Sequence, residues 1–446
     1  MNKQIGDHSR IYGSLKKLIA LAHNQYYYRK VSIVGRENLP KKGAVILAPN
    51  HPNHLMDPLA VLFTTKGQPV FMARADIFKQ GTIAKILTFL KILPIYRIRD
   101  GFKTVTDKND LVFEIAKDHL IKERTLVIHP EGSTEGTKRL RGLKKGLARL
   151  AFQSSEDTDH TLDLKVVPVG IDYGSFSKQS TDLLVQYGKP IDLKDYISEY
   201  EENPVKTINQ FTKDVQAEMK ELLLHIPDQE VFEVANLYER KLLHQKSHLE
   251  RIQATQQYAD HLKEIKEQQP EPWKNIQAKA NKLTVLLNKM GVKKRNIGQF
   301  LTPMSIKKGI GSILSAPLFL WGVLHHIIPL FLSHKVASTS KDKDAYSMFR
   351  FAVSLLSLPL FYSIYTGIIA SVTDTWEVTL TYALSLPLSG LFANKMRYHF
   401  EHTYFRMKWY WTKAFNKKTA KALLEEEKEL TELIYLAGNK KQLAAS

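Results

Sequence analysis

The first half of the chain alternates short apolar runs with segments whose apolar residues repeat at helical spacing. The short runs have the length of strands, and several end in polar or turn residues. Strands that alternate with helices are typical of an α/β domain built around one sheet. We therefore predict an α/β domain over residues 31–229, with strands at 31–34, 44–48, 70–73, within 92–101, at 125–128, at 166–171 and near 183.

An amphipathic helix is predicted before this domain, within residues 1–30. Tyr12, Leu15, Ile19 and Tyr26 recur at helical spacing, and basic residues flank them. Such a helix either lies in a membrane interface or packs on the domain, and the sequence leaves both alternatives open.

Residues 230–300 differ in character from the domain before them. They are rich in Lys, Glu and Gln, with leucines at helical spacing and one break at 269–272. Two long helices that form a charged hairpin fit this pattern better than a second catalytic domain does. We expect a solvated connector here, and the alternative is a surface that binds a specific partner.

Three apolar blocks follow within residues 301–396, at 312–332, 351–372 and 378–393. The second block is long enough to cross a bilayer, whereas the third is at the short limit. Basic residues flank the blocks, and the link between the second and third is acidic. We predict that these two form a membrane hairpin and that the first, which contains Pro317 and Pro329, re-enters or lies in the interface. A buried helical core is the alternative.

The last segment, residues 397–446, is predicted to be a basic helical tail. Aromatic residues alternate with basic ones over 398–411, which is typical of a membrane interface. A charged helix is predicted over 418–436. Together with the apolar blocks, this tail completes a membrane-associated helical region at the carboxyl end.

The net charge narrows the choice of partners. The 446 residues carry a formal net charge of +19, which favours binding to an anionic bilayer or to nucleic acid. The basic residues cluster around the apolar blocks, and the sequence contains no recognisable motif for reading nucleic acid. We therefore predict anionic membrane lipid, and no nucleic acid, as a partner.

Several kinds of chemistry are excluded by what the sequence lacks. It contains no cysteine, which excludes disulfides, thiolate nucleophiles and cysteine-ligated metals, and no Walker or Rossmann loop. His325 and His326 lie in apolar context without carboxylates at metal-ligand spacing, so we expect no metal and no cofactor. The first residues are polar and show no signal-peptide pattern, so we expect the α/β domain to lie on the cytoplasmic side. The apolar blocks predict that the protein is bound to a membrane.

Candidate chemistry begins at the end of the second predicted strand, where His51 is followed by Asp57. A carboxylate that holds an imidazole fixes its tautomer and stabilises the imidazolium, so the pair acts as a general base. His51 and Asp57 form such a pair if the chain turns into a helix between them. The alternative is a loop histidine and an aspartate that caps a helix.

Three further segments place polar or turn residues at strand ends. They are 92–101, which ends in arginines, 125–133, which runs into a Pro-Glu-Gly turn, and 166–171. The order and content of the four motifs resemble the glycerolipid acyltransferase family, which includes glycerol-3-phosphate and 1-acylglycerol-3-phosphate acyltransferases. The resemblance spans residues 31–191 and implies a mixed-sheet acyltransferase domain flanked by helices.

The resemblance implies a role for each motif. His51, oriented by Asp57, takes the proton of the acceptor hydroxyl, which attacks an acyl thioester without an acyl-enzyme intermediate. An arginine of the second motif contacts the acceptor phosphate; Arg97 matches it, and Arg99 is a close rival. The third motif supplies Glu131, which helps to bind the acceptor, and the fourth shapes the donor site. The implied substrate-binding residues are Asn50, Arg97, Arg99, Glu131 and Gly132.

Three features depart from the family pattern. Five residues rather than four separate His51 from Asp57, a spacing associated with a branch that acts on glycerol-3-phosphate or dihydroxyacetone phosphate. His129 stands in place of the usual phenylalanine, and Thr134 in place of the usual arginine. The basic run that follows contains Lys138, Arg139, Arg141 and Lys144. It is either a solvated or membrane-facing helix start or the source of the phosphate contacts, for which we expect Lys138, Arg139 and Lys144.

The resemblance predicts an O-acyltransferase of phospholipid biosynthesis. It transfers a fatty acyl group from acyl-CoA or acyl-carrier protein to a hydroxyl of glycerol-3-phosphate or lysophosphatidate. The alternative is a noncatalytic membrane-associated lipid-binding protein with an acyltransferase-like domain. The missing arginine favours that alternative, and the intact His51, Asp57 and Glu131 oppose it.

Overall fold

The computed structural model describes residues 5–78, 81–95, 105–242, 246–293, 296–301, 306–342 and 344–444. The chain divides into two compact units. The first contains Met1–Leu223 together with Pro329–Ser357, and the second contains Leu224–Ile328 together with Leu358–Ser446. The first unit breaks close to the predicted end of the α/β domain at residue 229. No sequence pattern indicated that residues 329–357 join it.

An eight-stranded sheet forms the centre of the first unit. Its strands are β1 (Lys30–Val34), β2 (Ala44–Pro49), β3 (Val70–Arg74), β4 (Ile92–Ile95), β5 (Thr125–Val127), β6 (Leu164–Tyr173), β7 (Asp182–Tyr187) and β8 (Ile191–Asp192). They follow the order β1-β7-β6-β2-β5-β3-β4, and β8 pairs with β6. β2 is parallel to both β5 and β6, whereas β6 and β7 are antiparallel. The predicted α/β class with a mixed sheet is therefore confirmed.

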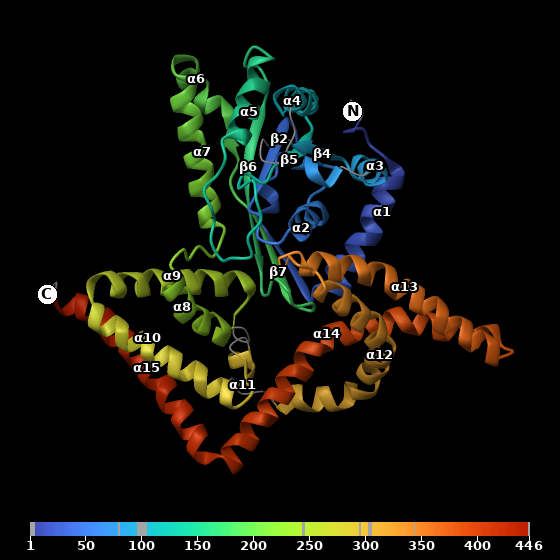
Figure 1. Cartoon of the computed structure of the whole chain (residues 1–446), viewed down its shortest axis with the longest axis vertical. Helices are drawn as coiled ribbons and strands as arrows, with labels where there is room; N and C mark the ends of the chain where they lie inside the picture. Colours follow the sequence, from blue (N-terminus) through green and yellow to red (C-terminus); the bar gives the residue numbers. More distant parts are fainter. Residues whose placement is uncertain are drawn as a thin grey trace. The chain divides into compact units, whose positions relative to one another are not determined.

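Strand β2 lies in the middle of the sheet, between β5 and β6, and all six of its residues are buried. Ile46 belongs to the apolar core on one face, with α4 (Val105–Ile121), α5 (Gly146–Glu156) and α7 (Pro204–Glu221). Leu47 belongs to the core on the other face, with α2 (Met56–Thr64). Figure 1 shows α5 and α7 alongside the sheet. A strand covered on both sides is apolar throughout, which is the pattern that predicted it.

Short helices complete the first unit. They are η1 (Ala22–Tyr27), η2 (Arg36–Asn38), η3 (Ala75–Phe78), α3 (Gly81–Phe89), η5 (Leu193–Tyr196) and α6 (Ile197–Glu202). Before them, α1 (Arg10–Leu21) packs on the domain: Tyr12 is buried, and the Lys16 ammonium donates a hydrogen bond to the carbonyl oxygen of Thr65 at 3.1 Å. A second stripe leaves Ile11 and Leu18 exposed. The helix therefore packs on the domain and still presents apolar side chains outward.

The second unit is helical (Figure 1). Its helices include α8 (Gln229–Leu242), α9 (His248–Gln268), α10 (Pro270–Lys289), α11 (Ile297–Leu301) and α15 (Lys417–Ala444). The break between α9 and α10 falls within the predicted break at 269–272. Lys279 of α10 forms ion pairs with Glu426 and Glu429 of α15, the first at 3.2 Å. These contacts pack α10 on another helix, whereas the charged sequence predicts a solvated connector.

Among the described residues, two helices are long and apolar enough to cross a membrane: Gly309–Ser338 of α12 (Ile306–Ser338), and α13 (Tyr346–Val372). They contain the first and second apolar blocks. The third block begins α14 (Trp376–Phe415), which is not such a candidate within the described chain. The candidate pair therefore differs from the predicted hairpin of the second and third blocks. Pro317 and Pro329 lie inside α12 without ending it.

Large apolar side chains of α12 and α13 are exposed rather than packed. Leu314 is 76% exposed and Leu356 is 75% exposed. Contiguous apolar surface of this kind is unfavourable in water and marks a membrane or protein contact. The exposure opposes the alternative of a buried helical core for these blocks.

Gly170 of β6 lies where the sheet packs closely against the chain that follows α7. A Cβ atom added there would lie 2.4 Å from the carbonyl oxygen of Leu222. We expect Gly170→Ala to lower the free energy of unfolding by about 1–3 kcal/mol, measured by urea unfolding followed by circular dichroism. Gly146→Ala is the matched control, because no atom lies within 4 Å of the added Cβ. An equal loss in both variants would contradict the packing argument.

Candidate active site

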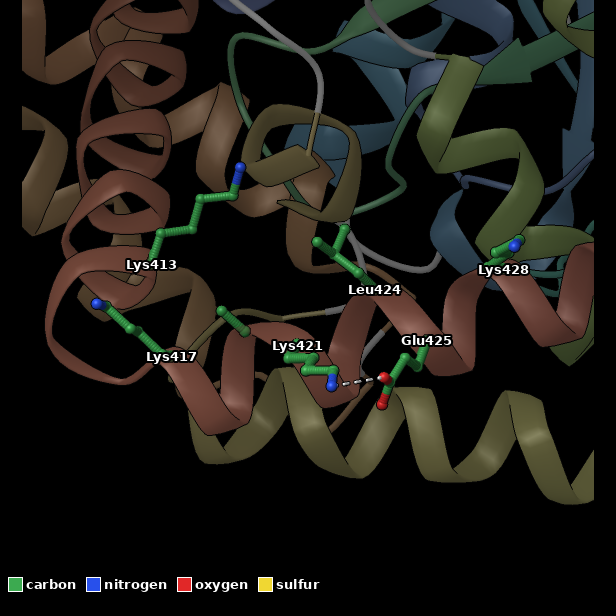
Figure 2. Close-up of a pocket in the computed structure, with 7 residues that line it drawn as sticks. Lys413, Lys417, Lys421, Leu424, Glu425 and Lys428 are labelled. Atoms are coloured by element: carbon green, nitrogen blue, oxygen red, sulfur yellow. Dashed lines mark ion pairs between the residues drawn. The ribbon is translucent and has the colours of Figure 1, made fainter.

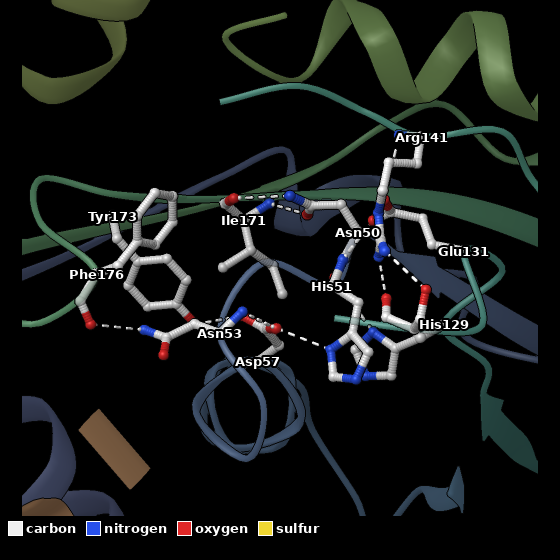
Figure 3. A network of polar contacts seen from close by, with 11 residues as sticks. Asn50, His51, Asn53, Asp57, His129, Glu131, Arg141, Ile171, Tyr173 and Phe176 are labelled. Atoms are coloured by element: carbon white, nitrogen blue, oxygen red, sulfur yellow. Dashed lines mark hydrogen bonds and ion pairs between the residues drawn. The ribbon is translucent and has the colours of Figure 1, made fainter. Parts of the chain in front are cut away.

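The end of strand β2 presents an imidazole to a buried carboxylate. His51 follows the strand, and Asp57 lies in the first turn of α2. Figure 3 shows the two side chains facing each other, with Nδ1 of His51 lying 2.8 Å from Oδ2 of Asp57. When the Nδ1–H group donates a hydrogen bond to the carboxylate, Nε2 is the unprotonated nitrogen that is able to accept a proton. The geometry matches a general-base pair rather than an unconnected loop histidine and helix cap.

Two further donors hold the Asp57 carboxylate. The backbone N–H of Asn53 donates to Oδ2 at 2.6 Å, and the Tyr173 hydroxyl donates to Oδ1 at 2.7 Å. His54 has a φ of 43°, a left-handed conformation that is uncommon for residues other than glycine. The turn at His54 accommodates the five-residue spacing between His51 and Asp57.

Asn50 ties the end of β2 to β6. Its side-chain amide donates to the carbonyl oxygen of Ile171 at 3.0 Å and accepts from the Ile171 N–H at 2.7 Å (Figure 3). Asn50 is also buried. The amide therefore faces the sheet, and Asn50 holds the strand that carries His51.

Glu131 connects the third motif to the backbone of His51. One carboxylate oxygen accepts the backbone N–H of His51 at 2.6 Å, and the other accepts the Nε–H of Arg141 at 2.8 Å. Arg141 also donates to the hydroxyl of Ser133 at 2.7 Å. Gly132 has a φ of 70°, which favours glycine at this turn. Glu131 thus links the backbone of His51 to a guanidinium.

Arg141 contacts Glu131, and the sequence did not distinguish it as a site residue. It was one of several cations in a basic run, and no pattern distinguished it from Arg139 or Lys144. The available signal was indirect, because Thr134 in place of the family's arginine leaves Glu131 without its usual neighbour in sequence. The structure brings a guanidinium to Glu131 from further along the chain.

The other predicted phosphate contacts lie in different environments. The Lys138 ammonium is buried and forms an ion pair with Asp172. Arg139 is exposed and pairs with Glu135 at 2.7 Å, and Lys144 is exposed. Only the latter two are accessible to a phosphate, so Lys138 differs from the role predicted for it. Arg97 and Arg99 lie outside the described residues.

His129 stacks on His51 in the position where the family pattern has phenylalanine. The ring centroids are 4.2 Å apart, and the ring planes differ by 24°. Burial lowers the pKa of both imidazoles to about 3. His51 is therefore a neutral free base at neutral pH.

One group of side chains has the spacing of a cation site. The ligand atoms of His54, Asp342 and Asp344 lie within 4.8 Å of one another. Sequence reasoning missed this group because its members are far apart in the chain. Both aspartates are exposed, and exposed acidic groups are common without an ion, so we assign no metal to them.

A hollow in the second unit offers another place for a site (Figure 2). It has a volume of about 400 Å³, and four lysines from α14 and α15 line it. Its one carboxylate, Glu425, pairs with Lys421 at 3.6 Å. No histidine lines this hollow. The hollow therefore lacks an imidazole, whose ordinary pKa lies close to neutral pH.

A protein-family model matches the part of the chain that contains this site. Residues 30–172 match the protein-family model described as acyltransferase, and this range contains His51, Asp57 and Glu131. Glycerol-3-phosphate O-acyltransferase 2 of Saccharomyces cerevisiae is 27% identical over 121 residues, which are 27% of this chain. The match spans only 16% of the length of that relative.

Among solved structures, the 1-acyl-sn-glycerophosphate (LPA) acyltransferase PlsC from Thermotoga maritima is similar at 18% identity. The match covers 46% of this chain and 79% of that chain, with a TM-score of 0.34.

The Asp57 carboxyl sets the expected pH dependence. Burial raises its pKa from 3.8 to about 7, and a protonated carboxyl no longer stabilises an imidazolium at His51. We expect kcat to fall as the pH decreases through about 7. Asp57→Asn should lower kcat and remove this acidic limb, because asparagine does not titrate. An unchanged limb in Asp57→Asn, measured in a pH series of kcat, would assign it to another group.

Lys138 is expected to stabilise the fold rather than to bind phosphate. Lys138→Ala removes the ammonium that faces the buried Asp172 carboxylate, which should lower the free energy of unfolding by about 3–5 kcal/mol. Lys144→Ala, at an exposed position, should change it by less than about 0.5 kcal/mol. Urea unfolding of both variants measures the difference. Normal unfolding with a raised acceptor KM in Lys138→Ala would instead support a phosphate contact.

Proposed function

We propose, from the premise that residues 30–172 form an acyltransferase-family domain, that this protein is an O-acyltransferase acting on a glycerolipid acceptor. The observation that carries the proposal is the 2.8 Å contact between His51 and the fully buried Asp57. The His51 side chain is itself 20% exposed, so that a hydroxyl group is able to reach it.

In the proposed reaction, Nε2 of His51 takes the proton of the acceptor hydroxyl as the oxygen attacks the carbonyl carbon of an acyl thioester. A new C–O bond forms, the C–S bond breaks, and the thiolate leaves with the electron pair of that bond. The imidazolium then returns its proton to the thiolate. Asp57 stabilises the imidazolium while it exists, because its carboxylate already holds Nδ1. Atoms and charges balance without a covalent acyl-enzyme.

The proposed acceptor is glycerol-3-phosphate or lysophosphatidate, and the proposed donor is acyl-CoA or acyl-carrier protein. The name of the Saccharomyces cerevisiae relative supports the first acceptor. Arg139 and Lys144, which are exposed in the run after the third motif, support a phosphorylated ligand. The sequence resemblance adds Arg97 as the expected phosphate contact and Arg99 as its rival. The product of either reaction belongs to phospholipid biosynthesis.

We further propose that the protein is membrane-bound, with the α/β domain on the cytoplasmic side. Two helices, Gly309–Ser338 and Tyr346–Val372, have the length and composition needed to cross a bilayer. Their exposed apolar side chains and the basic residues that flank them support this placement. A poorly soluble acylated product also favours an enzyme held at the membrane.

The sequence left open a noncatalytic lipid-binding role, because Thr134 stands in place of the family's arginine. The guanidinium of Arg141 lies 2.8 Å from the carboxylate of Glu131, which weakens that argument. We therefore retain the catalytic proposal.

His51→Ala tests the proposed base directly. Removal of a general base should lower kcat by about 10²–10⁴-fold, while circular dichroism stays that of the wild type. His54→Ala is the control in the same turn. The hydrogen bonds described for the Asp57 carboxylate come from His51, Asn53 and Tyr173, and not from the His54 side chain. The assay uses the full chain in membranes, labelled acyl donors, a panel of phosphorylated acceptors and product mass. Wild-type turnover in His51→Ala would remove the base assignment.

A further inference from the structure

The first turn of α13 contacts the loop that follows β6, within the first compact unit. The Ser347 hydroxyl donates a hydrogen bond to the carbonyl oxygen of Phe176, and the Tyr27 hydroxyl donates to the carbonyl oxygen of Ser347 at 3.3 Å. Phe351, one turn further along, packs edge-on against Tyr27 with ring centroids 5.4 Å apart. Ser347 and Phe351 are both buried. The start of this apolar helix is therefore fixed to the domain.

The carbonyl group of Phe176 also supports the proposed base. Nδ2 of Asn53 donates to it at 3.2 Å (Figure 3), and the backbone N–H of Asn53 donates to Oδ2 of Asp57 at 2.6 Å. The Oδ1 atom of Asn53 is buried and has no hydrogen-bond partner within the described part of the chain. The Phe176 carbonyl therefore has a large share in fixing the Asn53 side chain.

Two donors share this one carbonyl oxygen, which has two lone pairs to accept them. Asn53 is one donor, and Ser347 is the donor that comes from the apolar helix. Without the Ser347 hydroxyl, the Phe176 carbonyl group is free to shift, and the Asn53 side chain then loses its fixed partner. A small displacement of Asp57 and His51 then follows, and the rate of a positioned proton transfer is sensitive to such displacements.

We propose that Ser347 is a positioning residue of the active site, which acts through Phe176 and Asn53 on the Asp57–His51 pair. The inference rests on the proposed function, because it takes His51 as the base. In this proposal, the start of α13 helps to position the catalytic residues. A helix with the composition of a membrane anchor thus has a second role in holding the base in place.

The first test compares Ser347→Ala with Ser354→Ala in the full chain, purified in mixed micelles of detergent and lipid. Ser354 is a matched control on the same helix, because it is buried and its hydroxyl has no hydrogen-bond partner among the described residues. We expect Ser347→Ala to lower kcat about tenfold with the acceptor KM unchanged, and Ser354→Ala to change neither. Wild-type kcat in Ser347→Ala would overturn the proposal.

A second pair of variants separates the hydroxyl from packing. Ser347→Thr and Ser347→Val have side chains of the same shape, and only threonine retains the hydroxyl. The threonine variant should have a kcat about tenfold above that of the valine variant. This comparison is informative even if the alanine variant fails to fold, since any crowding by the added methyl group affects both variants. Equal kcat values would contradict a role for the hydroxyl.

Asn53→Ala tests the route of the effect. If Ser347 acts through Asn53, then Ser347→Ala lowers kcat no further in the Asn53→Ala background. A general loss of structure would instead multiply the two effects. Multiplied losses would overturn the proposed path.

The His51→Ala variant distinguishes this inference from the proposed function. Full activity in His51→Ala would remove the proposed function and this inference with it. Loss of activity in His51→Ala, combined with wild-type activity in Ser347→Ala, would remove the positioning role alone.

Discussion

A buried carboxylate needs hydrogen-bond donors, and at Asp57 different parts of the chain provide them. His51 comes from the end of β2, the Asn53 N–H from the turn that follows, and the Tyr173 hydroxyl from the end of β6. Because a buried carboxylate without donors is costly, the two strand ends and the turn must keep their relative positions. The orientation of the imidazole is therefore set when the domain folds, before any substrate is present.

Two charged residues of the site region form contacts within the domain. Glu131 links the His51 backbone to Arg141, and Lys138 is paired with Asp172 inside the domain. A motif read from sequence assigns such residues to the substrate, because it records only which residue types recur. In the structure, Glu131 and Lys138 also stabilise the frame around the partly exposed His51 imidazole.

Sequence reasoning succeeded where the signal is local. The strands that deliver His51 and Glu131 are continuous apolar runs, and burial on both faces of a central sheet requires such runs. The pairing of His51 with Asp57 needed only a turn into a helix between them. Both the strands and this turn depend on residues that are close together in the chain.

Contacts between distant residues were beyond that reasoning. Asn50 bonds to Ile171 across the sheet, and its amide gives no sign in sequence of facing a strand rather than a ligand. Arg141 lies in a run of similar basic residues, and its contact with Glu131 gives no separate signal in the sequence. The apolar blocks were found, but which of them form the candidate spans depends on where α12 continues through its prolines.

Phe351 completes the apolar core on the α2 side of the sheet, although it comes from α13. Its ring meets those of Tyr27 and His23, with centroids 5.4 and 5.6 Å away. A fragment that ends before α12 lacks this ring and exposes the cavity that it fills. The α/β domain is thus a poor choice for expression as a soluble piece. Its core is complete only after α12 and the start of α13 have been synthesised.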